Sequence, residues 1–101
     1  CWHEDEAEAK RMARTHWPNA ALPSPLMPEL KLPEHYEAAV AFMSDDDAAS
    51  AVLSGPDPDR YVAAIHQYAN AGFDHIYLHQ VGPDQDGFFR FYKNQVLPRL
   101  S

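Results

Sequence analysis

Apolar and polar positions alternate along most of this chain with the three- and four-residue spacing of amphipathic helices. Ala9, Ala13 and Trp17 form one such series, which predicts a helix over residues 3–16 that ends before Pro18. The same spacing, together with capping residues and Pro and Gly stop signals, predicts four more helices. They cover residues 33–42, 45–51, 58–71 and 84–97.

Residues 73–80 break this helical pattern. Ile76, Tyr77 and Leu78 form a continuous apolar centre of strong strand formers, which is typical of a strand buried on both faces of a parallel sheet. The order helix, strand, helix predicts an α/β fold. A lone strand leaves its backbone unpaired, at about 1–3 kcal/mol for each buried group. We therefore expect its partners to come from another chain or from polypeptide outside these residues.

Residues 18–33 contain five prolines and keep neither a helical nor a strand period. They predict an irregular loop that is longer than most connections and rich in leucine. Ordered loops of this length often act as lids or binding loops. A packed structural connector is an equally good interpretation of the same pattern.

Composition narrows the classes of function. The net charge of -7 and the isoelectric point near 5.1, with Lys and Arg scattered, argue against a nucleic-acid partner. No apolar run approaches the roughly 20 residues of a membrane-spanning helix, and the acidic start has no signal-peptide character. The single cysteine, Cys1, cannot form an internal disulfide and fits a reducing, cytoplasmic setting.

Candidate metal ligands do not converge in the sequence. Residues 45–47 are consecutive aspartates, which point in different directions on a helix, so we expect a solvated turn that complements the helix dipole. His75 and His79 share one face of the predicted strand but lie about 13 Å apart, too far to bind one metal ion. The aromatic run over residues 88–92 predicts core packing rather than a stacking platform.

Two parts of the chain resemble a known family. The distinctive part reads GPDPDRYVAAIHQYANAGFDHIYLHQVGPDQDGFFRFYKNQVLPRL, and the first part reads CWHEDEAEAKRMARTHWPNAALP. Both are similar to the C-terminal end of luciferase-like flavin and deazaflavin oxidoreductases. The resemblance is greatest to the branch of glucose-6-phosphate dehydrogenases that use coenzyme F420.

The resemblance implies that all 101 residues form one C-terminal segment of a (β/α)8 TIM barrel, mostly helical by itself. Residues 1–17 would follow the seventh strand, whose last residues would be Cys1–Trp2. Residues 18–54 would form an insertion. Residues 55–101 would supply a helix, the eighth strand over 73–80 and the final helix.

The family's chemistry is hydride transfer between the deazaflavin and an alcohol or sugar-type substrate, with flavin mononucleotide as the alternative cofactor. Most cofactor contacts in the family come from earlier strands, so the isolated fragment should be inactive and should not bind F420 tightly. His79 and Gln80 would border the substrate or cofactor site at the end of the eighth strand. Local hydrogen bonding at a strand end is the competing interpretation of both residues, and no catalytic residue is identified.

The chain departs from the sugar-phosphate members of the family in one respect. Met27 and Ala51 occupy positions where those members carry basic residues that hold the phosphate, and Lys31 lies near the first. A phosphorylated substrate therefore fits poorly. The alternative to an enzyme fragment is a non-enzymatic, acidic oligomerisation or binding module. Under either hypothesis the expected partner is the rest of the barrel or another copy of the chain, so a homo-oligomer is expected.

Overall fold

The computed structural model describes residues 1–22 and 27–100, which are mostly helical. Residues Tyr92–Val96 form a π-helix, which is followed by a 3-10 turn. In chain order the elements are α1 (Glu6–His16), η1 (Pro18–Ala21), η2 (Met27–Glu29), α2 (Pro33–Val40), α3 (Asp45–Ala51), α4 (Pro58–Asn70), α5 (Gln85–Phe91), η3 (Tyr92–Val96) and η4 (Leu97–Arg99).

The predicted α/β fold, with a strand over residues 73–80 as part of a (β/α)8 barrel, is wrong for this structure. No strand or sheet occurs among the described residues. Residues 75–80 run without regular secondary structure, and the backbone groups of residues 74–79 form no hydrogen bonds with the described chain. The physical reason is that a strand is defined by its neighbour, and no other extended segment among the described residues pairs with this one.

The predicted end of a seventh strand at Cys1–Trp2 is not a strand either. Its amino group donates to the carbonyl of Leu53 at 2.5 Å, and Gly55 N donates to the carbonyl of Cys1 at 3.1 Å. These two bonds form the pattern of one bridge between parallel strands, but no second bridge follows it among the described residues.

Side-chain caps set the helix boundaries much as the sequence predicts. The Asp57 carboxylate caps α4 with Pro58 in the first turn, and Asp84 accepts a hydrogen bond from Gly87 N at 2.8 Å to start α5. Gly72 follows α4 with a φ of +103°, as expected for a glycine stop. The first helix begins later than predicted, because Asp5 caps it and places its first residue at Glu6.

The aspartates at 45–47 form the capping turn that the sequence predicts. Ser44 and Asp47 make a reciprocal capping box at the start of α3. Lys10 and Arg14 of α1 pair with Asp46 and Asp45, which holds α1 against α3. These pairs are exposed and each stabilises the contact only slightly.

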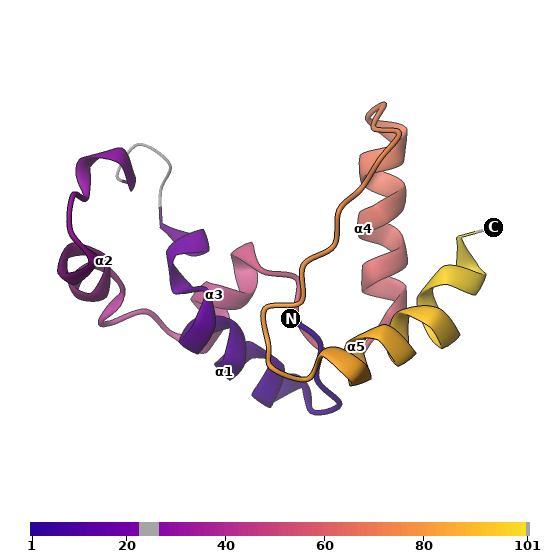
Figure 1. Ribbon diagram of the computed structural model, residues 1–101, viewed down its shortest axis with the longest axis horizontal. Coiled ribbons are helices and arrows are strands. Elements are labelled where there is room, and N and C mark those ends of the chain that lie inside the picture. Colours follow the sequence, from indigo (N-terminus) through magenta and orange to yellow (C-terminus); the bar gives the residue numbers. More distant parts are fainter. Residues whose placement is uncertain (23–26, 101) are drawn as a thin grey trace.

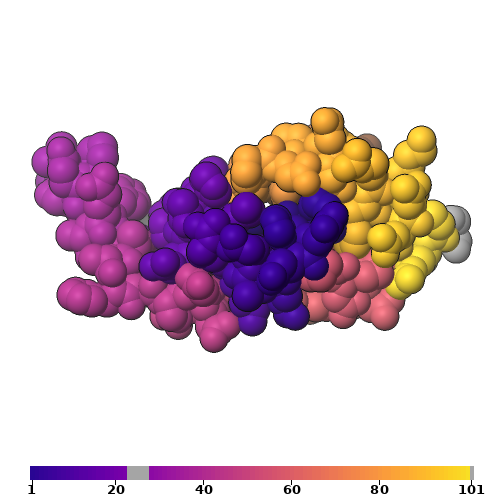
Figure 2. Space-filling model, turned by 90° about the horizontal axis from the view of Figure 1, so that it is seen from below, coloured from indigo at the N-terminus to yellow at the C-terminus, as the bar shows by residue number. Residues whose placement is uncertain are grey.

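Two arms diverge from a base that contains the N-terminus (Figure 1). One arm holds α1, α2 and α3, and the other holds α4 and α5, with residues 73–83 running between them. The radius of gyration is 14.8 Å, against about 13 Å for a compact domain of about 100 residues. Figure 2 shows the N-terminal residues lying between the extended arm and the C-terminal part. The molecule is therefore less compact than a typical single domain of this length.

Two small hydrophobic clusters replace a single core. The first joins α4 to α5 and the second joins α1 to α3, and Cys1–Trp2 contributes one residue to each. The first contains Trp2, Tyr61, Phe88, Phe91, Tyr92 and Val96, and the second contains Cys1, Ala13 and Ala48. The predicted core packing of the aromatic run is thus confirmed for Phe88, Phe91 and Tyr92.

Candidate functional site

Gln80, one of the two predicted site residues, is buried and 4% exposed. Its Oε1 accepts a hydrogen bond from Trp2 N at 2.9 Å, and its Nε2 donates to Trp2 O at 3.0 Å. The amide therefore holds the backbone of Trp2 as a neighbouring strand would. Gln85 Nε2 donates to the Gln80 carbonyl at 3.2 Å and fixes the turn that follows. This geometry gives Gln80 a positioning role in the described structure.

His79, the other predicted site residue, is exposed and lies next to Trp17 at the end of α1. The two rings meet edge to face, with their centroids 5.2 Å apart and an interplanar angle of 88°. Its imidazole forms no hydrogen bond with the described residues. The His79 ring is therefore accessible to solvent, whereas Gln80 beside it points into the protein. The role of both residues in a substrate or cofactor site stays a prediction.

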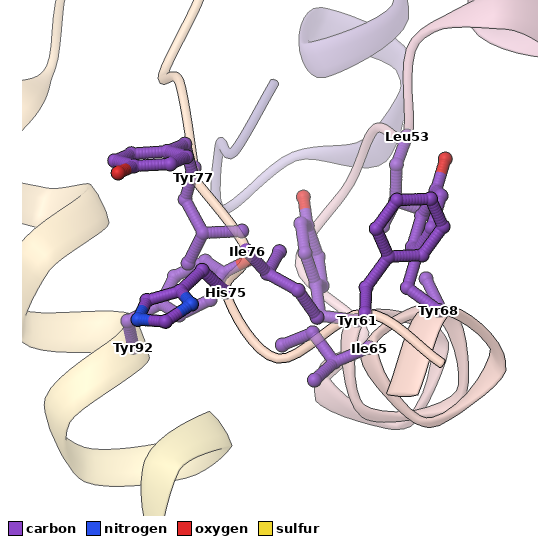
Figure 3. Close-up of a pocket in the computed structure, with 11 residues that line it drawn as sticks. Leu53, Tyr61, Ile65, Tyr68, His75, Ile76, Tyr77 and Tyr92 are labelled. Carbon is purple, nitrogen blue, oxygen red and sulfur yellow. The ribbon is translucent and has the colours of Figure 1, made fainter. Parts of the chain in front are cut away.

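An apolar groove of about 340 Å³ lies between α4 and residues 73–78. Figure 3 shows side chains entering it from α4 on one side and from the extended segment and Tyr92 on the other. His75 is the one imidazole on its wall, and no Lys, Arg, Asp or Glu lines it. The lining residues are Leu53, Tyr61, Ala64, Ile65, Tyr68, Phe73, His75, Ile76, Tyr77, Leu78 and Tyr92.

Two tyrosines under this groove are kept neutral by their surroundings. Burial raises the pKa of Tyr92 to about 12 and raises the pKa of Tyr61 further. The Tyr61 hydroxyl donates to the Gly55 carbonyl at 2.7 Å. Both rings stand edge-on to their aromatic neighbours, so they serve packing rather than proton transfer at neutral pH.

The described residues contain no candidate metal site. No group of three or more His, Cys, Asp and Glu side chains in residues 1–22 and 27–100 could hold a metal ion. The groove has no charged donor or acceptor to orient a polar cofactor, and the amide of Gln80 already has partners. No helix in the described part is long and apolar enough to cross a membrane.

Sequence reasoning missed the contribution of Trp2. Its side chain is 8% exposed, packs on Phe91 with ring centroids 5.7 Å apart and approaches Gly87. Its indole Nε1 is buried and has no hydrogen-bond partner among the described residues. Position 2 carries no local signal for this role, because the contacts come from residues more than 75 positions away in the sequence.

Comparison with known proteins gives evidence on relatives of the chain, which the geometry of the site does not supply. No family model matches the chain. An F420-dependent glucose-6-phosphate dehydrogenase of Beutenbergia cavernae is 31% identical over 96 residues, which cover 95% of this chain and 28% of that protein. F420-dependent glucose-6-phosphate dehydrogenase 2 of Rhodococcus jostii is 28% identical over 98 residues, covering 97% and 29%. The chain is therefore similar, over nearly all of its length, to part of proteins named F420-dependent glucose-6-phosphate dehydrogenases.

Identity is higher over shorter stretches. The F420-dependent glucose-6-phosphate dehydrogenase of Microbacterium testaceum is 43% identical over 53 residues, which are 52% of this chain and 16% of that enzyme. The chain thus spans less than a third of the length of these relatives. The predicted resemblance to F420-dependent oxidoreductases is confirmed as similarity to part of their length, whereas the wider luciferase-like grouping stays a prediction.

Proposed function

We propose that this chain is part of a longer F420-dependent oxidoreductase that transfers a hydride between the deazaflavin and an alcohol or sugar-type substrate. The similarity that extends over 95–97% of the chain to F420-dependent glucose-6-phosphate dehydrogenases carries this proposal. Those relatives are more than three times as long as the matched region, so the activity belongs to the longer protein. The residues of this chain contribute an edge of the site and its support.

Within that site, bound F420 would supply the carbon centre that exchanges a hydride with the substrate carbon. Oxidation of an alcohol also requires that its hydroxyl proton be removed by a base. His79 is the residue of this chain that suits a proton-transfer or polar contact, because its ring is exposed and its nitrogens have no partner among the described residues. Gln80 would act through the backbone of Trp2 rather than on substrate.

We also propose that the substrate of the longer protein lacks a phosphate at the position that the sugar-phosphate members recognise. Ala51, at the end of α3, is exposed and carries no charge. Lys31 lines a groove that also contains Glu37, so a phosphate there would meet a carboxylate as well as an ammonium group. The side chain of Met27 lies outside the described part of the structure, and a neutral thioether cannot bind an anion by charge.

Reduction of F420 by the longer protein tests the proposed function. With F420 and a panel of alcohols and sugars, cofactor fluorescence should fall with at least one substrate, and free glucose should be turned over in preference to glucose 6-phosphate. Replacement of F420 by flavin mononucleotide should abolish turnover. Turnover with flavin alone would refute the deazaflavin assignment, and a preference for the phosphorylated sugar would refute the substrate assignment.

The role of His79 is tested in the same assay with two matched variants. His79→Gln should lower kcat/KM by about 10²-fold or more and flatten the limb of the pH–rate profile that reports the base. His66→Gln provides the control, because His66 is an exposed residue of α4 outside the groove and away from the 79–80 turn. Equal activity of the two variants would place the proton acceptor elsewhere in the longer protein.

A further inference from the structure

His79 lies on a segment whose backbone gives its side chain little support. The backbone groups of residues 74–79 form no hydrogen bond with the described chain, and the imidazole is exposed. An exposed side chain on such a segment can adopt several rotamers. Removal of a proton from a substrate hydroxyl requires the base to keep one orientation toward that hydroxyl. The ring therefore needs a further contact that holds its orientation.

Trp17, which follows the last residue of α1, supplies such a contact. Its ring and the His79 ring are nearly perpendicular, at 88°, with their centroids 5.2 Å apart. Among the described residues this is the one ring contact of the imidazole, which forms no hydrogen bond there. The usual strength of a perpendicular ring pair corresponds to a preference of roughly 2- to 12-fold for one orientation. Because the contact is between rings, it leaves the imidazole nitrogens available to a substrate.

The backbone of Trp17 is itself held in place. Its N–H donates to the carbonyl of Ala13 at 2.9 Å, and its carbonyl accepts from Ala20 N at 3.3 Å. Pro18 restricts the backbone of the preceding tryptophan further. The helix that ends here is docked on α3, where Ala13 and Ala48 are both fully buried. Trp17 therefore presents its ring to His79 from a fixed element of the fold.

We infer that Trp17 is a positioning residue, which holds the His79 imidazole in the orientation that accepts the substrate proton. The inference rests on the proposed function, because it assigns a purpose to a contact of the proposed base. Core packing does not account for the indole, since Trp17 is 42% exposed and belongs to neither hydrophobic cluster. Trp17 acts through His79 and needs no contact with the substrate.

A double-mutant cycle between Trp17 and His79, measured as F420 reduction by the longer protein, tests this role. Trp17→Ala should lower kcat about 3- to 10-fold with little change in KM, because the imidazole is correctly oriented in fewer of the substrate complexes. Trp17→Phe should keep most of the native kcat, since a phenyl ring can also stand perpendicular to the imidazole. In a His79→Gln background, Trp17→Ala should cause no further loss. Phe42→Ala is the matched control, because it removes a fully exposed aromatic ring from the same arm.

The outcomes separate this inference from the proposed function. Full activity of Trp17→Ala, or equal losses from Trp17→Ala with and without His79, would overturn the inference alone. Native activity of His79→Gln, or no F420 reduction by the native protein, would refute the proposed function and the inference with it.

Nuclear magnetic resonance of the longer protein with labelled histidines reports the ring contact independently of activity. The ring resonances of His79, assigned by their loss in His79→Gln, should shift in Trp17→Ala and stay unchanged in Phe42→Ala. Resonances that do not move in Trp17→Ala would overturn the inference at any level of activity.

Discussion

Replacement of Gln80 by alanine should destabilise the whole molecule, although the sequence predicts a role for this residue at a substrate or cofactor site rather than in stability. The side chain forms both of its hydrogen bonds with the backbone of Trp2, at 2.9 and 3.0 Å. Trp2 is 8% exposed and belongs to the larger hydrophobic cluster, while its neighbour Cys1 belongs to the smaller one. The alanine variant leaves a buried N–H and a buried C=O without partners.

The magnitude follows from those two groups. Each buried backbone group that loses its partner costs about 1–3 kcal/mol, and water entering the space left by the amide recovers part of this. We therefore expect a loss of about 3 kcal/mol in the free energy of unfolding. For a chain of this length the loss corresponds to a decrease of about 12–24 °C in Tm.

Thermal and urea unfolding, followed by circular dichroism, would measure the effect. Gln67→Ala is the matched control, because it removes the same side chain from an exposed position of α4 where the amide has no partner among the described residues. The control should change the stability by no more than about 0.5 kcal/mol. Equal unfolding midpoints for Gln80→Ala and Gln67→Ala would refute the structural role of the Gln80 amide.

Gln80→Glu adds a pH dependence whose sign is fixed by the structure. The carboxylate can accept from Trp2 N but faces the carbonyl oxygen of Trp2, to which Gln80 Nε2 donates in the native protein. Burial and this carbonyl both favour the protonated acid, so its folded pKa lies above the unfolded value of about 4.3. The variant should match the native protein more closely below about pH 4 and lose stability as the pH rises. Stability that increases with pH above that point would contradict the geometry.

Three further changes test other contacts. Gly87→Ala should destabilise by about 1–3 kcal/mol in urea unfolding despite the better helix propensity of alanine, because its Cβ would clash with the Trp2 ring. Ser44→Ala should cost about 1 kcal/mol in the same assay through loss of the capping box, and no change would refute the role of the cap. Burial raises the pKa of Tyr92 to about 12 and that of Tyr61 further, so stability should be lost as the pH rises from about 10 towards 12. An ultraviolet titration in which all tyrosines ionise together near pH 10 would contradict this.

The features that could be predicted from sequence are those decided by neighbouring residues. Asp57 with Pro58 and the Ser44 capping turn are in place, because a cap needs a side chain only two or three residues from the backbone it satisfies. Ala9 and Ala13 are fully buried as their spacing predicts. The prediction is wrong for the third residue of this series. Trp17 is 42% exposed and contacts His79, and it does not belong to the cluster that contains Ala13 and Ala48.

The predicted strand failed for the opposite reason. Helical hydrogen bonds close within four residues, so α4 satisfies its own backbone wherever the chain is placed. Residues 73–80 have the composition of a strand, but their backbone can be satisfied only by a second extended segment, and the described chain supplies none. A strand-like composition thus shows that a segment can form a strand when a second segment is available to pair with it. It does not show whether that second segment is present.

The same dependence on a neighbouring segment explains the outcome for Gln80. The sequence predicts this residue at the border of a substrate or cofactor site, whereas in the structure its amide supports the backbone of Trp2. A polar residue at the end of an apolar run predicts a group facing solvent or ligand when the neighbouring segment is unknown. Here the neighbour is Cys1–Trp2, and the amide replaces the backbone hydrogen bonds that a longer strand would make. Cys1 and Trp2 each pack into a different cluster, so this contact fixes one arm relative to the other. The position of the adjacent His79 therefore depends on Gln80. Under the role proposed for His79, a loss of activity in Gln80 variants of the longer protein would follow from movement of His79, without any direct contact between Gln80 and substrate.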